Sequence, residues 1–367
     1  MSRILISGYY GFNNAGDDVV LYGIISSLKR EQPNISLAVL SNQPDRTAEL
    51  FGIEAYDRWN LGTIFRELKR SDMLVMGGGT LMQDVTSPRS VLYYLGIVMI
   101  AKLLGKPVVF YAQGFGPILK SLSRTMIKQV VNRVDVITVR DEESGEDFKA
   151  CGVKRAPIHV TADPALTILP EQVSDVRGKE LLRDLFSDPS RPLVAISVRD
   201  WKQEQDFKVS IAKAADWFIE QGWNVLFLPM HFPSDLAPSR HIMEKMERQG
   251  AKLLDAHVSF HDIMSVLKQC DYVVGMRLHS LILACMLRIP FTGISYDPKI
   301  DRFVERAGMP NAGHITQLEA DAFLSLLAER LAVLDQERES IAMHALLLEK
   351  EAAKSSELVL QALRRKR

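Results

Sequence analysis

The sequence is poor in cysteine and carries no net charge. Three cysteines in 367 residues (Cys151, Cys270 and Cys285) form no CxxC pair, which excludes a disulfide framework and indicates a reducing compartment. Lys and Arg together number 45, as do Asp and Glu, and neither half of the chain is strongly basic. A protein that binds nucleic acid through a positively charged surface is therefore not expected.

Long hydrophobic runs are also absent. The longest, Val91 to Ala101, has eleven residues, whereas a membrane-spanning helix needs about twenty. The chain opens directly on strand-like residues and shows no signal-peptide pattern. We therefore expect a cytoplasmic protein, with peripheral contact to the inner face of the cell membrane as its closest approach to a bilayer. The terminal basic residues Arg364 to Arg367 indicate a solvated helix end that adds a weak attraction to anionic lipid.

Short β-branched runs alternate with segments of helical period. This order predicts an α/β protein whose parallel sheets are covered by helices on both faces. Helices are expected at about 18–29, 61–70, 90–104 and 121–131, and from 315 to the end. Strands are expected at Ile4–Ser7, Ser36–Leu40, Met73–Met76, Pro107–Tyr111, Val134–Val139, Leu193–Val198, Asn224–Leu228, Tyr272–Val274 and Phe291–Ile294.

The length of the chain favours two domains. The alternation is lost between Asp163 and Gly178 and restarts afterwards. We therefore expect an N-terminal Rossmann-like domain over residues 1–172 and a C-terminal one over residues 173–367, the latter ending in helices. Ligands of such sheets bind beyond the carboxyl ends of the strands, so the loops that follow strands are the candidate sites.

In the first half, the loop Gly8–Asp18 joins a strand to a helix. Its glycines permit tight turns and its Asn14 and Asp17 can face a ligand, with Asp17 placed to orient a sugar hydroxyl. Alternatively, Asp17 or Asp18 only caps the helix.

Three further strand ends of the same half carry small or polar residues. The segment Gly77–Thr80 either lets a ligand approach the backbone, with Gly78 and Thr80 as the candidate contacts, or forms only a tight turn. It precedes a loop that ends at Pro88. Gln113 follows the next strand, and Arg140 and Asp141 follow the one after. The last two residues either bind a ligand or pair with each other and cap a helix.

In the second half, cationic residues follow three strands. These residues are Arg199, His231 and the pair Arg277 and His279. Cations at a helix N-terminus are unfavourable unless an anion completes the site, so the pair predicts an anion-binding site. Alternatively, Arg277 pairs with a carboxylate and His279 is a buried structural histidine.

Together these motifs resemble the polysaccharide pyruvyl transferase family. The resemblance rests on Gly8–Asp18, Gly77–Thr80, Gln113-Gly114, Val139–Asp141 and above all Arg277–Ser280, and it covers most of the chain except the helical tail. Within the family, the sequence is most similar to the CsaB-type enzymes of Gram-positive cell-wall polymer synthesis.

The resemblance implies a fold similar to GT-B glycosyltransferases, with two Rossmann-like domains facing a central cleft. It implies transfer of pyruvate from phosphoenolpyruvate to a sugar as a ketal, with release of phosphate. In CsaB-type enzymes the acceptor is a lipid-diphosphate-linked disaccharide whose N-acetylmannosamine gains a 4,6-ketal, and the polymer anchors surface-layer proteins. In relatives, the residues matching Arg199, Arg277, Leu278 and His279 bind phosphoenolpyruvate.

The chemistry of the donor agrees with this assignment. Its phosphate and carboxylate need several cationic groups, which suits Arg199, His231, Arg277 and His279 in the C-terminal domain. The resemblance adds Leu278 to this donor set. We expect His279 to act as the general acid and Asp17 as the base, with Arg277 assisting. No metal or cofactor is required, because the arginines balance the charge. The acceptor set, in the N-terminal domain, comprises Asn14, Asp17, Gly78, Thr80, Gln113, Arg140 and Asp141.

Two alternatives remain open. A glycosyltransferase that uses a sugar nucleotide would need an acidic residue for the ribose, a role open to Asp297 or Glu305. A non-catalytic glycan-binding protein would keep the ligand sites and show no turnover.

Overall fold

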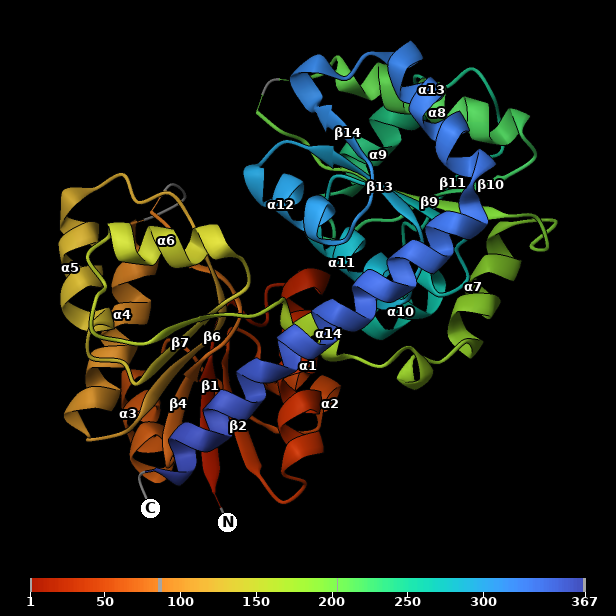
Figure 1. The fold of residues 1–367 in the computed structure, drawn as a ribbon. Helices are drawn as coiled ribbons and strands as arrows, with labels where there is room; N and C mark the ends of the chain where they lie inside the picture. Colours follow the sequence, from red (N-terminus) through yellow and green to blue (C-terminus); the bar gives the residue numbers. More distant parts are fainter. Residues whose placement is uncertain (1, 85–87, 203, 366–367) are drawn as a thin grey trace. The chain divides into compact units, whose positions relative to one another are not determined.

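The computed structural model describes residues 2–84, 88–202 and 204–365, and it divides into two compact units (Figure 1). Unit 1 comprises Met1–Ile168 and Leu348–Arg367, and unit 2 comprises Leu169–Leu347. Each unit holds one sheet, and each is described separately below.

The sheet of unit 1 has the strand order β3-β2-β1-β4-β6-β7-β8, with β5 paired to β6. Every pairing in the described residues of this sheet is parallel. The sheet therefore presents the carboxyl ends of its strands along a single edge. Its strands are β1 (Arg3–Ser7), β2 (Ser36–Ser41), β3 (Glu54–Asp57), β4 (Met73–Met76), β5 (Gly79–Met82), β6 (Val108–Phe115), β7 (Val136–Val139) and β8 (Ile158–Val160).

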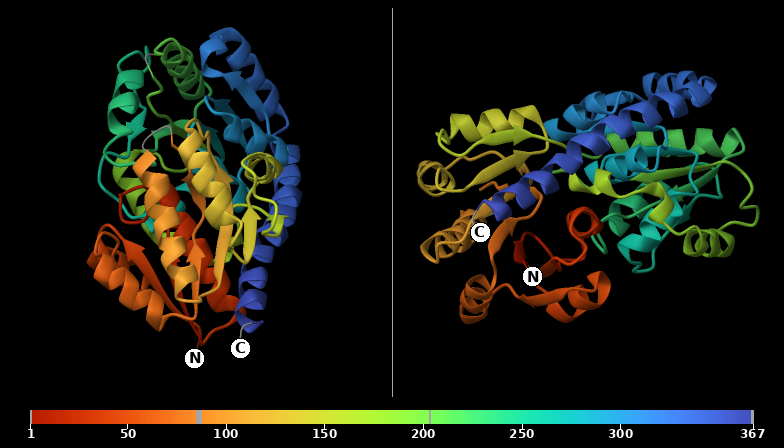
Figure 2. Two further views of the ribbon diagram at one scale, coloured as in Figure 1. Left: turned by 90° about the vertical axis from the view of Figure 1, so that its left-hand side faces the viewer. Right: turned by 60° about the horizontal axis from the view of Figure 1, so that its bottom comes forward.

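Helices cover both faces of this sheet. One face lies against α3, α4, α5 and α6, whose buried apolar residues share a core with the strands (Figures 1 and 2). On the other side, α1 packs against a 3₁₀ turn, η1 (Pro164–Thr167). The helices are α1 (Ala15–Glu31), α2 (Pro44–Phe51), α3 (Leu61–Arg70), α4 (Pro88–Leu103), α5 (Ser121–Val131) and α6 (Glu142–Ala150).

The C-terminal helix returns to unit 1. This helix, α14 (Leu334–Arg364), places two buried serines against unit 1. Ser355 bonds to Thr138 and Thr161, each at 2.9 Å, and Ser356 is 2.8 Å from Ser27. The expectation of helix to the end of the chain is confirmed up to Arg364; Lys366 and Arg367 lie outside the described residues.

Unit 2 repeats the architecture. Its sheet has the order β11-β10-β9-β12-β13-β14, and its described pairings are parallel. The strands are β9 (Leu193–Ser197), β10 (Asn224–Phe227), β11 (Lys252–Leu253), β12 (Tyr272–Gly275), β13 (Phe291–Ser295) and β14 (Asn311–His314). The helices are α7 (Val176–Leu185), α8 (Phe207–Glu220), α9 (Leu236–Met243), α10 (Phe260–Leu267), α11 (Leu278–Met286), α12 (Pro298–Arg306) and α13 (Ala320–Ala332), with 3₁₀ turns η2 (Pro170–Gln172) and η3 (Ile315–Gln317).

The predicted α/β class with parallel sheets is confirmed. Within it, the expectation of an unstructured loop from the glycine turn to Pro88 was wrong, because Gly79–Met82 forms β5; residues 85–87 lie outside the described part.

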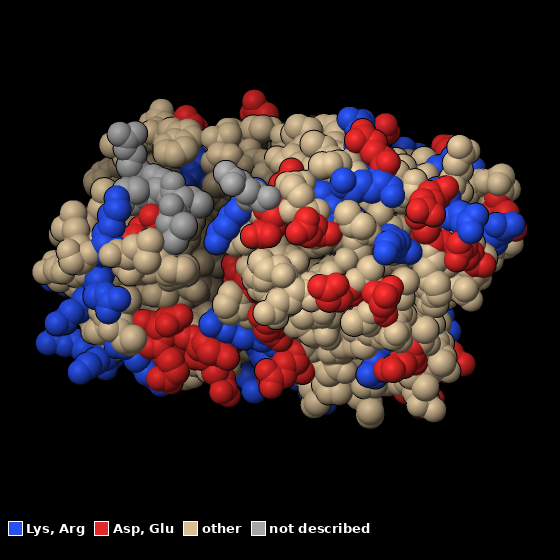
Figure 3. All heavy atoms as spheres, turned by 90° about the horizontal axis from the view of Figure 1, so that it is seen from above, with Lys and Arg blue, Asp and Glu red and all other residues tan. Residues whose placement is uncertain are grey.

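Acidic and basic side chains are interspersed over much of the face drawn in Figure 3. Among the described residues, no helix combines the length and apolar content needed to cross a membrane.

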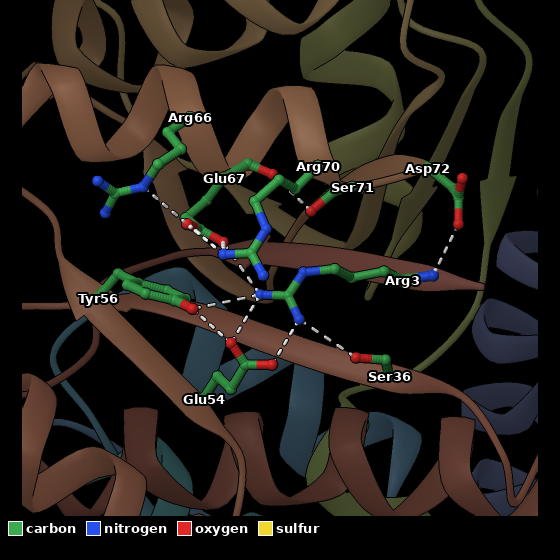
Figure 4. Close-up of polar contacts among 9 residues, drawn as sticks. All are labelled: Arg3, Ser36, Glu54, Tyr56, Arg66, Glu67, Arg70, Ser71 and Asp72. Atoms are coloured by element: carbon green, nitrogen blue, oxygen red, sulfur yellow. Dashed lines mark hydrogen bonds and ion pairs between the residues drawn. The ribbon is translucent and has the colours of Figure 1, made fainter. Parts of the chain in front are cut away.

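A charged cluster ties together the amino-terminal edge of the unit 1 sheet (Figure 4). Arg3 at the start of β1 donates to Glu54 at 2.5 Å and to Glu67 at 3.1 Å. Glu67 is completely buried and also accepts from Arg66 and Arg70. Buried carboxylates are stable in proteins only when they are paired in this way, so the cluster fixes α3 against β1 and β3 at the edge opposite the candidate ligand loops.

Candidate active site

The first candidate loop follows β1. Asn14, in an extended conformation, caps α1 by accepting a hydrogen bond from the backbone N–H of Gly16 at 3.1 Å. The alternative in which Asp17 or Asp18 caps the helix is therefore wrong, and α1 begins at Ala15 rather than near Asp18 as expected. Both aspartates lie in the first turn, where the positive end of the helix dipole stabilises carboxylates.

Asp17 and Asp18 face different surroundings. Oδ1 of Asp17 lies 3.6 Å from the position a Cβ of Gly79 would occupy, so this carboxylate is beside the glycine turn that follows β4. Asp18 is 4% exposed, and burial raises its pKa to about 6 despite an ion pair with Arg46 at 3.8 Å. Only Asp17 therefore reaches the strand edge at which a ligand would bind.

The glycines of the turn are required by close packing. A Cβ on Gly77 would overlap the hydroxyl of Tyr10, and one on Gly78 would lie 2.8 Å from Cγ1 of Val20. Gly79 has a φ of +90°, a conformation that favours glycine. Tyr10 is fully buried, and its hydroxyl has no hydrogen-bond partner among the described residues. Burial, followed by the charge of Asp17, holds the pKa of Tyr10 well above its usual range.

Gln113 and Arg140 join neighbouring strands. Buried Gln113 donates through Nε2 to the carbonyls of Gly77 and Met76. Arg140 donates to Thr80 Oγ1 at 3.2 Å and forms ion pairs with Asp141 at 3.7 Å and Asp163 at 3.5 Å.

Asp141 also caps α6 by accepting from the N–H of Ser144. The alternative in which Arg140 and Asp141 pair and cap a helix is thus confirmed.

The unit 1 edge is mildly acidic overall. Three carboxylates, Asp17, Asp141 and Asp163, lie there with two guanidinium groups, those of Arg140 and Arg58. Arg58 donates to the Gly8 carbonyl at 2.9 Å. This edge offers hydroxyl-binding oxygens and would repel a multiply charged anion.

In unit 2, Arg199 follows β9 and retains an unneutralised charge. Its Nη1 donates to the hydroxyl of Tyr296 at 2.9 Å and its Nε to the carbonyl of Asp200 at 3.3 Å. The guanidinium also lies 4.8 Å from the Tyr296 ring and 5.3 Å from the Trp201 ring. Within the described part of the chain these acceptors are all neutral, so the charge of Arg199 remains available to an anion.

Arg277 is instead held by a carboxylate. It forms a bidentate pair with Asp235 through Nε, at 3.0 Å, and Nη2. Asp235 is 1% exposed and also accepts from the N–H groups of Met230 and His231. The predicted alternative that Arg277 pairs with a carboxylate is confirmed. Asp235 accepts from Nε and Nη2 and does not bond to Nη1. The ion pair therefore fixes the orientation of the Arg277 guanidinium.

Leu278 and His279 occupy the first turn of α11, for which Arg277 is the N-cap residue. Leu278 is buried and His279 is partly buried. Ser280 donates to the carbonyl of Arg277 at 2.6 Å, which secures the start of the helix. His231 follows β10, next to β9 in the sheet, so Arg199, His231 and Arg277 follow three adjacent strands.

Sequence reasoning missed several residues at these edges. Tyr296 follows β13, and the hydroxyl of Ser197 at the end of β9 is buried without a partner among the described residues. Both stand at strand ends, so the rule that selected Arg199 could have found them. Asp235 lies four residues after His231, and no sequence signal distinguishes its role from that of an ordinary loop aspartate. Among the described residues, no group of three or more His, Cys, Asp or Glu side chains could hold a metal ion.

The candidate ribose ligands of a glycosyltransferase have other roles in unit 2. Asp297 caps α12 by accepting from the N–H of Lys299 and forms an ion pair with its Nζ at 3.0 Å. Glu305 is exposed in the last turn of α12, away from the strand ends.

The chain is similar to known proteins along most of its length. Residues 14–298, more than half of the chain, match the family described as Polysaccharide pyruvyl transferase. The Amylovoran biosynthesis protein AmsJ of Erwinia amylovora is 22% identical, over 92% of this chain and 93% of its own.

Solved structures share the fold. The UDP-GlcNAc 2-epimerase from Neisseria meningitidis, bound to UDP-GlcNAc, has a TM-score of 0.68 at 12% identity over 100% of both chains. Anabaena Alr3699/HepE in complex with UDP-glucose has a TM-score of 0.67 at 12% identity, again over 100% of both chains. These likenesses confirm the predicted GT-B-like class with two Rossmann-like units.

Proposed function

Since the chain belongs to the polysaccharide pyruvyl transferase family, we propose that it transfers the pyruvyl group of phosphoenolpyruvate to two hydroxyls of a sugar. The products are a ketal and inorganic phosphate. The observation that carries the proposal is the pair of arginines at adjacent strand ends of unit 2, one unneutralised and one held in direction by Asp235.

The donor binds at the unit 2 edge in this proposal. Arg199 supplies a full positive charge, and Arg277 presents the side of its guanidinium that Asp235 does not use. Guanidinium groups suit both the phosphate and the carboxylate of phosphoenolpyruvate, because each can accept two parallel hydrogen bonds. His231, Leu278 and His279 complete the donor site.

His279 acts as the general acid. It protonates the methylene carbon of the donor, which becomes the methyl group and leaves an oxocarbenium-like centre on the adjacent carbon. One sugar hydroxyl adds to that centre and loses its proton. The C–O bond to phosphate then breaks, and the second hydroxyl adds with loss of its proton. The base is Asp17, assigned because its carboxylate lies beside the glycine turn of unit 1.

The acceptor binds at the unit 1 edge. Its excess of carboxylates favours a neutral polyol over a phosphate-rich ligand. Asp17, Gly78, Thr80 and Arg140 form the acceptor surface. Asn14, Gln113 and Asp141 support it by holding backbone groups of the loops: they bond to Gly16, to Gly77 and Met76, and to Ser144.

The specific acceptor in this proposal is N-acetylmannosamine in a lipid-diphosphate-linked disaccharide. The sugar is converted to a 4,6-ketal, and the product belongs to a secondary cell-wall polymer that anchors surface-layer proteins. The CsaB-type pattern of the sequence supports this choice. The likeness to an amylovoran biosynthesis protein supports a polysaccharide acceptor more generally.

A sugar-nucleotide glycosyltransferase is the competing activity, because solved structures with this fold bind UDP-sugars. Incubating the enzyme and an acceptor separately with phosphoenolpyruvate and with UDP-sugars distinguishes the two. Phosphate release that depends on the acceptor supports the proposal, whereas UDP release without phosphate release contradicts it. Arg199→Ala is the matched control for donor-dependent turnover.

A further inference from the structure

The outward face of α4 in unit 1 is apolar. Leu92, Gly96, Met99 and Leu103 are spaced by four, three and four positions, so they share one side of the helix. Leu92 and Met99 are each 42% exposed, Leu103 is 84% exposed, and a Cβ on Gly96 would meet nothing within 4 Å. Surface helices normally carry charged or polar residues on this side, so the face is suited to burial against another surface.

The neighbouring helices continue the same apolar surface. Both α3 and α5 contact α4, and the three helices stand side by side in Figure 2. Eight of the fifteen exposed large hydrophobic side chains in the described part belong to these helices or directly precede them, which concentrates them on one layer. We call this surface the apolar face; its members are Trp59, Leu61, Phe65, Leu92, Met99, Leu103, Leu119 and Leu122.

Basic residues accompany the apolar face. Residues 61–133 contain ten Lys or Arg and only three Asp or Glu, although the whole chain is neutral. Two of these acidic residues, Glu67 and Asp84, are buried. In Figure 3 basic side chains follow the left-hand edge, where α5 lies in Figure 1. The first turn of α6, by contrast, is acidic, with Glu142 and Glu143. The exposed basic residues are Arg66, Lys69, Arg70, Lys120, Arg124, Lys128 and Arg133.

We infer that the apolar face docks unit 1 on the surface of a bilayer that contains anionic lipid. Apolar side chains enter the boundary between headgroups and acyl chains, and neighbouring Lys and Arg side chains attract the anionic headgroups. The helices run antiparallel to the strands, so the first turns of α3 and α5, with Leu61 and Leu122, lie at the strand-carboxyl edge that also holds Asp17. Docking therefore places the acceptor edge near lipid, although the inference does not depend on the proposed reaction.

The test uses the purified full chain and vesicles, without any substrate. In flotation assays we expect binding to vesicles of phosphatidylcholine with phosphatidylglycerol, little binding to phosphatidylcholine alone, and loss of binding at high salt. The double variant Met99→Glu/Leu103→Glu should lose most of this binding. Met343→Glu/Leu347→Glu, which changes residues that are 62% and 60% exposed elsewhere on the chain, is the matched control and should bind normally.

Charge reversal tests the same surface without altering its apolar residues. Lys69→Glu/Lys128→Glu should weaken partitioning by more than about fivefold for each residue changed, whereas Lys213→Glu on α8 should have little effect. Circular dichroism verifies folding of each variant. Equal binding to neutral and anionic vesicles, or variants of the face that bind like the wild type, would overturn the inference. The inference would also be overturned if the wild type sedimented as a dimer and the Met99→Glu/Leu103→Glu variant as a monomer. The apolar face would then be buried against a second copy of the chain.

Discussion

At the scale of single residues, Arg199 and Arg277 differ in their partners. This difference gives the two arginines different roles, one supplying charge and the other supplying oriented hydrogen-bond donors. Asp235 neutralises Arg277 and fixes its direction, whereas Arg199 contacts only neutral acceptors and aromatic rings among the described residues. At the proposed donor site, Arg199 therefore contributes most of the net positive charge. Arg277 contributes a preoriented set of donors, which reduces the reorganisation needed on binding.

Removing either arginine should weaken donor binding. Arg199→Ala and Arg277→Ala each lose charge-assisted hydrogen bonds in a partly desolvated site, a loss on the order of 2–5 kcal/mol. Steady-state kinetics should show kcat/KM for phosphoenolpyruvate reduced by at least about thirtyfold, with an unchanged melting temperature for Arg199→Ala. Arg191→Ala, at the opposite edge of the unit 2 sheet, serves as the control. Wild-type kcat/KM in either variant would remove that arginine from the donor site.

His279→Gln tests the general acid. Glutamine keeps a hydrogen-bond donor but cannot deliver a proton, so kcat should fall about 10²–10⁴-fold while donor affinity stays within about tenfold. Rapid-quench kinetics together with donor binding measured by calorimetry separates these effects. Lost affinity with unchanged kcat would make His279 a binding residue only, and the acid would then be sought at His231.

Asp18→Asn should stabilise the protein above neutral pH. Burial raises the pKa of Asp18 to about 6, so the folded state holds its proton more tightly than the unfolded state does. The stability from this group is complete below about pH 4 and is lost as the pH rises through 6. At pH 8 the variant should gain up to about 3 kcal/mol in the free energy of unfolding, and at pH 3.5 almost none. Denaturant titrations at both pH values check this, with exposed Asp45→Asn as control; a gain that is equal at both pH values would contradict it.

At the level of helices and strands, two glycines in unit 1 show how packing decides the effect of a methyl group. A Cβ on Gly23 in α1 would overlap the carbonyl of Pro164 in η1, whereas a Cβ on Gly96 in α4 would project into open space. Gly23→Ala should therefore destabilise the protein by about 1–3 kcal/mol. Gly96→Ala should stabilise it by up to about 1 kcal/mol through helix propensity. Thermal unfolding of the Gly23→Ala and Gly96→Ala variants tests both expectations. Shifts of the same sign in the two melting temperatures would contradict the role of packing.

Elements with strong hydrophobic periodicity could be predicted from the sequence. The bounds 61–70, 73–76 and 121–131 match α3, β4 and α5, because apolar residues and flanking polar ones agree there. Five strands were missed, namely β3, β5, β8, β11 and β14. The exposed β3 lacks an apolar run, and β5 begins at a glycine, so its pairing with β6 depends on tertiary contacts that local propensity does not report.

For the whole molecule, the sequence predicted the candidate strand ends and the pair of chain neighbours Arg140 and Asp141, but not which distant residues their side chains contact. Arg199, His231 and Arg277 do follow adjacent strands, as the parallel order requires. The Asp235–Arg277 pair joins residues 42 positions apart, and the burial of Tyr10 depends on the whole sheet. Such contacts arise from the three-dimensional fold, so a single sequence without structure offers no signal for them.

In the proposed reaction, this chain forms a pyruvyl ketal on a polysaccharide precursor. Mass spectrometry of candidate lipid-linked saccharides after incubation with the enzyme and phosphoenolpyruvate tests it most directly. We expect a mass increase equal to one ketal-linked pyruvate on the acceptor, dependent on phosphoenolpyruvate and lost with Arg199→Ala. An acceptor that instead gains the mass of a hexose from a UDP-sugar, and remains unchanged with phosphoenolpyruvate, would contradict it.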